Sequence, residues 1–282
     1  MHMRIALVQM NTVLGEVQSN LARHLGWIEQ ASQQRADLVI FPELSLTGYM
    51  LQDLALEVAI QPALAQPVFL QLLEATVGLD VMVSFVEVDE RSRFYISSAY
   101  LSQGEILHVH RKVYLPTYGM FDEKRFFTPG NQVRAFDTRF GRAGILVCED
   151  FWHLSLPYLL WQDGADLFFF HAASPAHGLG TDGRMASEQQ VDALLGVYAS
   201  LFTGFVAYTN RVGYEDGLHF PGGAQVIDPS GRSLLLAGSE EGMYCVDIDL
   251  QQIRRTRFRL PLLRDEQPEL VLRELQRILN KR

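Results

Sequence analysis

Short apolar runs alternate with stretches of helical periodicity along this chain. An apolar run over Arg4–Gln9 predicts a strand. Leu21, Leu25 and Ile28 then recur at the spacing of an amphipathic helix. The next apolar run, Asp37–Phe41, ends at a proline and is typical of a buried strand. The same patterns predict further strands at Val81–Val88, Ser97–Leu101, Ile106–His110, Gly144–Val147, Ala165–Phe170, Phe205–Thr209, Ala224–Ile227 and Met243–Ile248, and helices at Ser155–Gln162, Arg184–Phe202 and Gln267–Leu279.

The order of these elements predicts an α/β layered fold. Strands and helices alternate and the second half is rich in strands, so we expect sheets whose faces are partly covered by helices. No repeat, low-complexity tract or linker divides the chain. We therefore expect one domain over residues 1–282, in which residues 263–282 form a C-terminal helical tail. The sequence Asp-Pro-Ser-Gly at Asp228–Gly231 predicts the turn of a hairpin.

Composition and charge narrow the possible functions. Hydrophobic residues make up 48% of the chain and charged residues 20%, which suits a globular protein with a sizeable core. The net charge of −9 argues against a nucleic-acid-binding protein, because phosphate contacts need a concentrated basic face. The one basic cluster, four arginines within residues 254–259, is typical of a solvated helix face.

Cysteine usage and hydrophobic run lengths bear on the compartment. The N-terminal apolar run is too short for a signal peptide, and no run approaches the roughly 18 residues of a membrane-spanning helix. Cys148 and Cys245 are the only cysteines, too few for a disulfide framework or a multi-cysteine metal site. We therefore expect a cytoplasmic protein without a membrane partner, in which a free thiol can act as a nucleophile.

Three reactive side chains follow three predicted strands. Glu43 comes one proline after the strand that ends at Phe41, and Lys112 comes one arginine after the strand that ends at His110. Cys148 directly follows a third strand and precedes a polar turn. In open α/β sheets, ligand crevices form beyond the carboxyl ends of the strands. We therefore expect the three side chains to converge in one pocket, although they are distant in sequence.

These residue types suit a cysteine-dependent hydrolysis. Backbone N–H groups at a strand-to-helix turn favour the thiolate of Cys148 and can hold an oxyanion. The Glu43 carboxylate can take the thiol proton as a general base and later activate water. The Lys112 ammonium would lower the pKa of the thiol and stabilise the tetrahedral intermediate, where one well-placed donor contributes ~3 kcal/mol.

Each residue taken alone also has a structural interpretation. A single buried cysteine is usually an inert small hydrophobe. Glu43 could cap a helix, and Lys112 could be a surface charge. His153 offers a Cys–His pair with Cys148, but it lies on the following turn, from which the sulfur is awkward to reach.

A metal site receives little support from the sequence. His108 and His110 fall on one face of a predicted strand, because side chains two residues apart point the same way. No further Cys or His ligand set accompanies them, so we expect no metal there.

Read with their neighbours, the three reactive residues resemble the nitrilase superfamily of carbon–nitrogen hydrolases. The likeness covers nearly the whole chain, and its three core segments occur in the family's order. This conjunction outweighs the separate structural interpretations. The core segments are Phe41–Tyr49 (FPELSLTGY), Arg111–Pro116 (RKVYLP) and Val147–Trp152 (VCEDFW), and weaker matches are Glu123–Gly130, Asn210–Gly213, Phe220–Gly223 and Asp228–Gly231.

The resemblance implies a four-layer αββα sandwich that forms a homodimer or a higher homo-oligomer. It implies that Glu43 is the general base, that Lys112 stabilises the oxyanion, and that Cys148 is the nucleophile of a thioester intermediate. Glu123 matches the family's second glutamate, which positions the substrate and the lysine. The backbone N–H of Glu149 would complete the oxyanion hole. No metal or organic cofactor is implied.

Several segments are most similar to the glutaminase domain of glutamine-dependent NAD synthetases. By this resemblance four side chains line the substrate pocket, namely Tyr49, Tyr118, Trp152 and Ser174. The matching segments are Leu46–Leu54, Leu115–Arg125, Cys148–Trp152 and Ala173–Pro175.

Two departures from that glutaminase pattern bear on the substrate. No Gly-rich pyrophosphate loop follows the hydrolase segments, so we expect any NAD synthetase to be a separate partner chain. Residues 176–184 also lack the Gly-basic pair that those domains place near the glutamine carboxylate. Arg184 is the candidate replacement, because a bidentate guanidinium is the natural partner of a carboxylate.

Three functions follow from these patterns. We expect an amidase that cleaves a non-peptide C–N bond of a small-molecule amide and releases ammonia. The alternative is a stand-alone glutaminase subunit that supplies ammonia to an ammonia-dependent NAD synthetase. The second alternative is a non-catalytic binding or assembly protein on the same fold.

Overall fold

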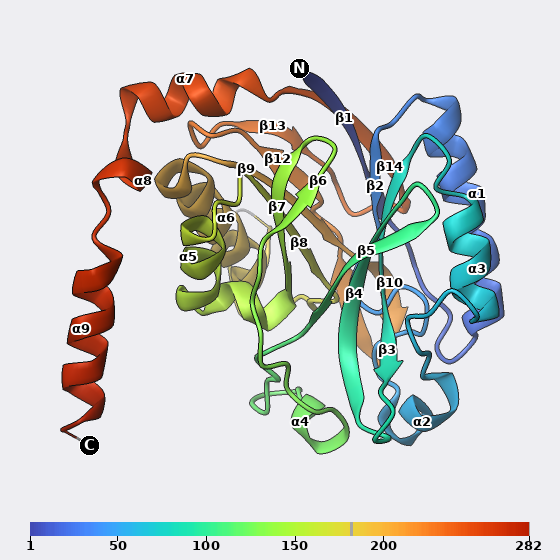
Figure 1. The fold of residues 1–282 in the computed structure, drawn as a ribbon. Helices are drawn as coiled ribbons and strands as arrows, with labels where there is room; N and C mark the ends of the chain where they lie inside the picture. The colour runs from blue at the N-terminus through green and yellow to red at the C-terminus, as the bar shows by residue number, and fades with distance from the viewer. Residues whose placement is uncertain (181–182, 282) are drawn as a thin grey trace.

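The computed structural model describes residues 1–180 and 183–281, which build two stacked six-stranded sheets (Figure 1). Thr181 and Asp182 in the expected substrate loop, and Arg282 in the expected tail, lie outside the described residues. The first sheet has the order β14 (Gly242–Asp249), β1 (His2–Gln9), β2 (Leu38–Ile40), β3 (Asp80–Val88), β4 (Phe94–Ser102), β5 (Glu105–Arg111), and the second has the order β13 (Ser233–Leu236), β12 (Gln225–Ile227), β9 (Phe205–Asn210), β8 (Leu167–Ala172), β7 (Gly141–Val147), β6 (Phe136–Thr138).

Helices and a small ribbon complete the described part of the chain. The ribbon pairs β10 (Val212–Glu215) with β11 (Leu218–Pro221). The α-helices are α1 (Val17–Gln33), α2 (Ala55–Val58), α3 (Pro67–Glu74), α4 (Glu123–Phe126), α5 (Ser155–Gln162), α6 (Ala186–Phe202), α7 (Gln251–Arg259), α8 (Leu262–Asp265) and α9 (Pro268–Leu279), and two 3₁₀ turns are η1 (Gln52–Leu54) and η2 (Cys148–Trp152).

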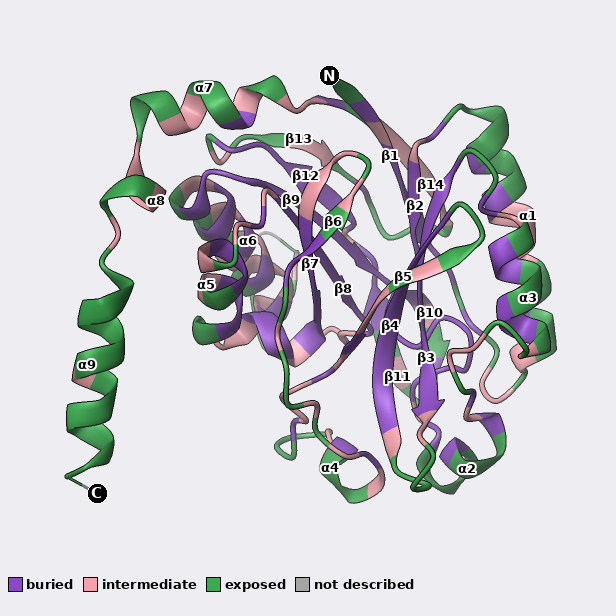
Figure 2. Ribbon diagram, viewed as in Figure 1, coloured by how far each residue is buried: buried purple, intermediate pink, exposed green. Residues whose placement is uncertain are grey.

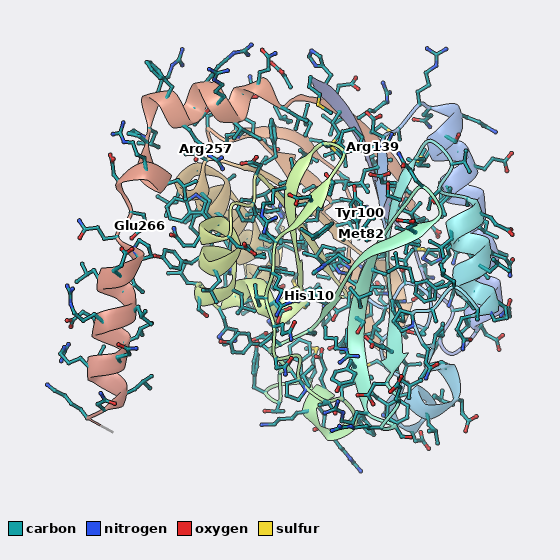
Figure 3. The ribbon with its side chains drawn as sticks, in the orientation of Figure 1. Met82, Tyr100, His110, Arg139, Arg257 and Glu266 are labelled. Carbon is teal, nitrogen blue, oxygen red and sulfur yellow. The ribbon has the colours of Figure 1, made fainter. Side chains whose placement is uncertain are left out.

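The alternation of side chains along the strands divides the hydrophobic core into layers. Ile5 and Leu7 of β1 belong to one buried cluster with Phe169 of β8, between the two sheets. Met82 and Tyr100, which Figure 3 labels, lie in the same inner layer. Because successive side chains of a strand point to opposite faces, the remaining apolar residues face outward and need a cover of helices.

Helices cover the outer face of each sheet. Leu21 of α1 and Phe69 of α3 are buried against the first sheet. Trp161 of α5 and Phe202 of α6 are buried against the second, and their ring centroids lie 5.1 Å apart. Figure 2 shows both sheets buried between these helices. The four layers confirm the expected αββα sandwich.

The strands that carry the reactive residues end in the same region. β1, β2 and β3 are parallel, as are β7, β8 and β9. β5 runs in the direction of β3 because both are antiparallel to β4. The N–H of Glu43, just beyond β2, donates to the Ala172 carbonyl at the end of β8 over 3.3 Å. The carboxyl ends of strands from both sheets therefore meet at one place.

The structure corrects several expected boundaries. The second-sheet strand expected from Ala165 begins at Leu167, because the Ala165 N–H still donates to the Leu160 carbonyl at the end of α5. The helix expected from Arg184 begins at Ala186. The pattern did not predict the short elements α2, α4, β6, β10 and β11, since three or four residues are too few to show a periodicity.

The C-terminal helix α9 stands apart from both sheets (Figure 1). None of its residues is buried. Leu272, Leu275 and Leu279 recur every three or four residues and give it one apolar side. Within residues 1–180 and 183–281, no helix combines the length and the apolar character that crossing a membrane requires.

Candidate active site

Glu43, Lys112 and Glu123 form a buried ion cluster where three chain segments meet. The Lys112 Nζ donates to Glu43 Oε1 and to Glu123 Oε1, over 2.8 Å in each case. The exposed fraction is 0% for Lys112, 1% for Glu43 and 5% for Glu123. One ammonium therefore holds two carboxylates in a dry site, which leaves one negative charge in excess when both are ionised.

Burial and charge set the protonation states within this cluster. Burial disfavours the Lys112 ammonium, but the Glu123 and Glu43 carboxylates outweigh it, and the pKa of Lys112 is raised well above its usual value. Burial raises the pKa of Glu123 to about 7, although Lys112 favours its anion. The lysine therefore stays charged at neutral pH, whereas Glu123 titrates near neutrality.

The Tyr49 side chain also contacts Glu123. Its hydroxyl donates to Glu123 Oε1 over 2.6 Å. The expected role of Tyr49 was to line the substrate pocket, and this hydrogen bond shows that its hydroxyl is engaged with the ion cluster. Glu123 Oε2 has no hydrogen-bond partner within the described residues.

Cys148 lies where β7 passes into η2. Its φ of +47° is left-handed, a conformation that is uncommon outside glycine and often found at functional sites. Burial raises the pKa of the thiol well above its usual value, Glu43 adds to this effect, and Lys112 opposes it. The resting sulfur is therefore a protonated thiol that needs a base, and both Glu43 and Lys112 are near enough to act on it electrostatically.

Asp150 ties the cysteine turn to the lysine segment. Its Oδ1 accepts the N–H groups of Val113 and Tyr114, each over 2.9 Å. Its Oδ2 accepts the N–H of Val147 over 3.2 Å and faces His110 Nε2 at 2.8 Å. One fully buried carboxylate thus fixes the residues directly after Lys112 to the residue directly before Cys148.

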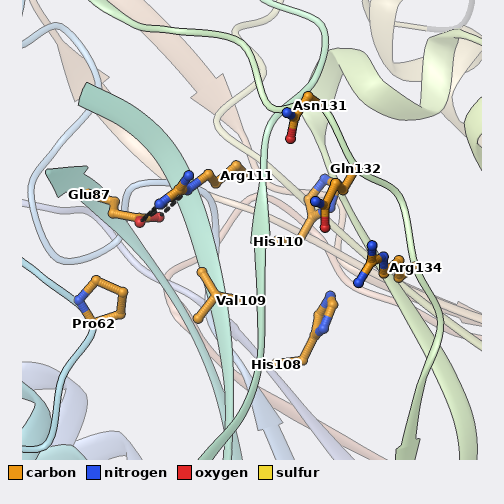
Figure 4. A pocket seen from close by; sticks show the side chains of 9 residues that line it. All are labelled: Pro62, Glu87, His108, Val109, His110, Arg111, Asn131, Gln132 and Arg134. Carbon is orange, nitrogen blue, oxygen red and sulfur yellow. Dashed lines mark hydrogen bonds and ion pairs between the residues drawn. The ribbon is translucent and has the colours of Figure 1, made fainter. Parts of the chain in front are cut away.

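His110 also lines a cavity on the far side of this network. The cavity has a volume of about 330 Å³ and lies along β5 (Figure 4). Arg111 in its wall is paired with Glu87, so the charge of that guanidinium is already balanced. The expectation of no metal at His108 and His110 remains a prediction. Within the described residues no group of His, Cys, Asp and Glu has the arrangement of a metal site.

The second oxygen of Glu43 and the segment after β8 form the opposite wall of the site. Glu43 Oε2 accepts the N–H of Ala173 over 2.7 Å. The next residue, Ser174, is held by Asn210, whose Oδ1 accepts the Ser174 N–H over 2.9 Å and whose Nδ2 donates to the Ser174 carbonyl over 3.1 Å. Ser174 therefore lies next to the anchored carboxylate, on a fixed backbone.

Two further expected site residues, Tyr118 and Trp152, lie at the turn that carries Glu149. The Tyr118 hydroxyl donates to Glu149 Oε2 over 2.7 Å, and the Tyr118 side chain is 57% exposed. Glu149 is the residue after Cys148, in the first turn of η2, where N–H groups lack partners within the turn. Trp152 closes the same turn and is half-buried, with its ring beside that of Phe151.

His153 is engaged elsewhere. Its ring stacks on Tyr114 with the centroids 3.5 Å apart, and its Nε2 lies 3.3 Å from Glu149 Oε1. Within the described residues, no hydrogen bond joins His153 to Cys148. His153 is engaged by Tyr114 and Glu149, whereas Glu43 is among the charges that act on the thiol, which favours Glu43 as its base.

Sequence reasoning missed two carboxylates that build the site. Asp150 is one. Glu215 in β10 is the other, and its Oε1 accepts the N–H groups of Tyr49 and Met50 over 2.8 and 2.7 Å. Arg211 donates to the second oxygen of Glu215 over 2.7 Å. Both carboxylates act on backbone that is remote in sequence, so no local pattern marks them.

Comparison with known proteins agrees with this geometry. A sequence model for carbon-nitrogen hydrolases matches residues 4–258. The chain belongs to the carbon-nitrogen hydrolase family. The resemblance seen in the sequence is thereby confirmed.

Relatives of this carbon-nitrogen hydrolase fall into two groups. A glutamine-dependent NAD(+) synthetase of Acinetobacter baylyi is 32% identical over 252 residues, which are 89% of this chain and 45% of that protein. An (R)-stereoselective amidase of a Pseudomonas species is 32% identical over 272 residues, 93% of this chain and 91% of that protein. The structure of an amidase from Nesterenkonia sp. is 27% identical, with a TM-score of 0.80, and covers 96% of this chain and 95% of its own.

The coverage separates the two groups. The chain spans less than half of the NAD synthetase but nearly all of the amidase. Both groups support an enzyme, a hydrolase that acts on carbon–nitrogen bonds.

Proposed function

We propose that this carbon-nitrogen hydrolase is an amidase that releases ammonia from a small amide through a thioester on Cys148. The observation that carries the proposal is the buried cluster in which one ammonium, that of Lys112, joins Glu43 and Glu123 beside the sulfur. A protonated thiol, a carboxylate base and a fixed cation are the groups that acyl transfer to sulfur requires.

In the first half of the proposed reaction, Glu43 takes the thiol proton while the Cys148 sulfur attacks the amide carbon. The carbonyl oxygen becomes an oxyanion, which the Lys112 ammonium and the Glu149 N–H stabilise. The tetrahedral intermediate collapses, the C–N bond breaks, and the nitrogen takes the proton back from Glu43. Ammonia leaves, and a thioester remains.

In the second half, water replaces ammonia. Glu43 takes a proton from the water, whose oxygen attacks the thioester carbon. The carbon–sulfur bond breaks, the carboxylic acid leaves, and the Cys148 sulfur recovers its proton from Glu43. Glu123 does not touch the sulfur in this scheme. It positions Lys112, which would otherwise be drawn to Glu43 alone.

The pH profile should report on Glu123. Its raised pKa of about 7 means that it takes up a proton as the pH falls through neutrality. Lys112 then interacts with Glu43 alone and holds it more firmly as an anion, which weakens Glu43 as a base. We expect kcat/KM to fall below about pH 7, and this inflection to be absent or displaced in Glu123→Gln. An identical inflection in both proteins, measured from pH 5 to 9, would assign it to another group.

The proposed function is tested by an ammonia-release screen. The panel contains glutamine, asparagine, simple aliphatic amides and N-carbamoyl compounds, with Cys148→Ala as the blank. At least one amide should release ammonia, and an acyl group should be trapped on Cys148 by rapid quenching and mass spectrometry. A protein that cleaves no member of the panel, and whose native Cys148 resists a thiol probe, would instead support the non-catalytic binding or assembly protein.

A glutaminase subunit is the second candidate, because 45% of the Acinetobacter baylyi NAD synthetase matches this chain at 32% identity, the same identity as that of the amidase. In that case glutamine is the best substrate of the screen. Adding a separate ammonia-dependent NAD synthetase should stimulate ammonia release. Absence of both effects would count against this candidate and leave the amidase proposal in place.

We also propose that the enzyme forms a homodimer through its outer helices. α9 exposes an apolar stripe that includes Leu272 and Leu275, and Leu159 of α5 and Leu201 of α6 are 50% and 48% exposed. Apolar stripes of this kind are usually covered by a partner. We expect a dimer in sedimentation velocity at micromolar concentration and a monomer for the double variant Leu272→Glu/Leu275→Glu.

The control for this prediction is Arg273→Glu, a substitution on the same helix that adds negative charge without removing an apolar residue. It should remain a dimer. A monomeric wild-type protein, or a dimer that survives both leucine substitutions, would contradict the proposed interface. A cytoplasmic location remains part of the proposal as well, because both cysteines are free and a reducing compartment keeps thiols in that form. Cell fractionation would test it.

A further inference from the structure

A small cavity adjoins the proposed reaction centre on the side of Ser174. Ser174, Tyr208 and Asn210, from the ends of β8 and β9, form one wall. Glu188 and Asp192 of α6 form the opposite wall. The residue before Ser174 donates its N–H to Glu43, so this cavity begins one residue from the proposed base. A substrate held by its amide group at Cys148 could extend its other end here.

The charge of this cavity is negative. Arg184 is the only cation among the residues that line it, and it is already bound. Its Nη1 donates to Asp192 Oδ2 over 2.6 Å, and its Nε lies 3.6 Å from Glu188 Oε1. Two carboxylates against one guanidinium leave one negative charge in excess. Arg184 was expected to receive a substrate carboxylate, and that role stays a prediction; in this structure its charge is balanced by these two carboxylates.

Tyr208 brings a buried phenol into the wall of this cavity. Its side chain is only 2% exposed and lines the cavity. Burial raises the pKa of the phenol, and the charges of Cys148, Glu43 and Asp192 add to the effect. The phenol is thus protonated and lies between the reaction centre and the acidic wall, where its oxygen can accept a hydrogen bond from a ligand.

The size of the cavity limits what can fill it. Its volume is about 20 Å³. A cavity needs a volume of at least ~10–15 Å³ to hold one water-sized group. A primary ammonium is about the size of a water molecule and donates hydrogen bonds to carboxylates and to a phenol oxygen. A carboxylate is larger and would meet like charge.

We infer that the enzyme prefers amides that carry a protonated amine, seated between Tyr208 and the Asp192 and Glu188 carboxylates. This inference rests on the proposed amidase function and specifies its substrate class. Tyr208 adds an aromatic face, which attracts cations. The site as a whole discriminates against an amide with a carboxylate at the same position.

The test compares three amides of nearly equal length that differ in terminal charge. They are γ-aminobutyramide, which is cationic, pentanamide, which is neutral, and succinamate, which is anionic. One charge interaction in a partly buried site corresponds to roughly a tenfold change in kcat/KM. We expect the cationic amide to exceed the neutral one by about that factor, and the neutral one to exceed the anionic one.

Variants of opposite charge keep the inference testable. Asp192→Asn neutralises the cavity and should reduce the preference for the cationic over the neutral amide about tenfold. Arg184→Gln makes the cavity more negative and should increase that preference, which remains measurable if Asp192→Asn fails to fold. Asp137→Asn is the matched control, because Asp137 is an exposed acid on β6 with a side chain 83% exposed. It should keep the wild-type ratio.

The outcomes separate this inference from the proposed function. Cleavage of the panel with succinamate preferred, or an unchanged ratio in both Asp192→Asn and Arg184→Gln, would overturn the cationic site and leave the amidase standing. No ammonia from any amide would count against the amidase itself.

Discussion

Replacing Cys148 by alanine should reduce ammonia release to the level of the buffer blank. The loss should be on the order of a million-fold, as is seen when the nucleophile of a comparable acyl-transfer enzyme is removed. Without the sulfur there is no thioester, and Glu43 would have to direct water at an unactivated amide. The measurement is ammonia release at saturating amide over hours, together with intact-protein mass spectrometry for the acyl adduct.

Cys245→Ala is the matched control for this prediction. Cys245 lies in β14, half-buried, and its sulfur contacts Gln34 far from the ion cluster. This variant should release ammonia at the wild-type rate and still form the acyl adduct. If Cys148→Ala retained measurable turnover of an amide that the wild type cleaves, a thioester mechanism would be wrong, whatever the fold.

The three reactive residues were predictable from sequence because each follows the end of a strand, largely buried in β2 and β7 and only partly buried in β5. Apolar runs mark such strands clearly, and the geometry of parallel sheets brings their carboxyl ends together. The contacts that set their chemistry were not predictable. Lys112 bridges Glu43 and Glu123, and Asp150 bridges segments around Lys112 and Cys148. These contacts depend on side chains remote in sequence, for which a single chain offers no periodic signal.

The same contrast between local patterns and remote contacts applies to the elements of the fold. The long elements follow from their hydrophobic pattern, and α5 has the bounds that were expected. The short strands of the β10–β11 ribbon carry no such pattern, although they supply Glu215, which holds the backbone at Tyr49. For Arg184 the sequence suggested a carboxylate receptor, and the structure adds that its Nη1 donates to Asp192, 8 residues further along the chain in α6. The role of Arg184 toward a substrate stays a prediction, and only the structure displays this side-chain pairing.

Replacing Lys112 by methionine should cost about 3–5 kcal/mol of folding free energy, as well as activity. Removing one partner of a buried ion pair leaves an uncompensated buried charge, and that charge is the source of a free-energy cost of this size. Here the Glu43 and Glu123 carboxylates would both remain in the site, with exposed fractions of 1% and 5%. Urea denaturation at pH 8, where Glu123 with its pKa of about 7 is mostly ionised in the wild type, measures the loss.

The pH dependence of that loss identifies its cause. Burial already raises the pKa of Glu123, and without the lysine nothing opposes that effect, so the variant gains stability as the pH falls and loses it as the pH rises. The deficit of Lys112→Met should therefore be larger at pH 8 than at pH 5.5, and adding Glu123→Gln should restore part of it. Lys124→Met, on the exposed side of α4, should stay within about 0.5 kcal/mol of the wild type. A deficit that is independent of pH and unaffected by Glu123→Gln would mean that lost packing around the lysine stem, and not the unpaired charge, destabilises the variant.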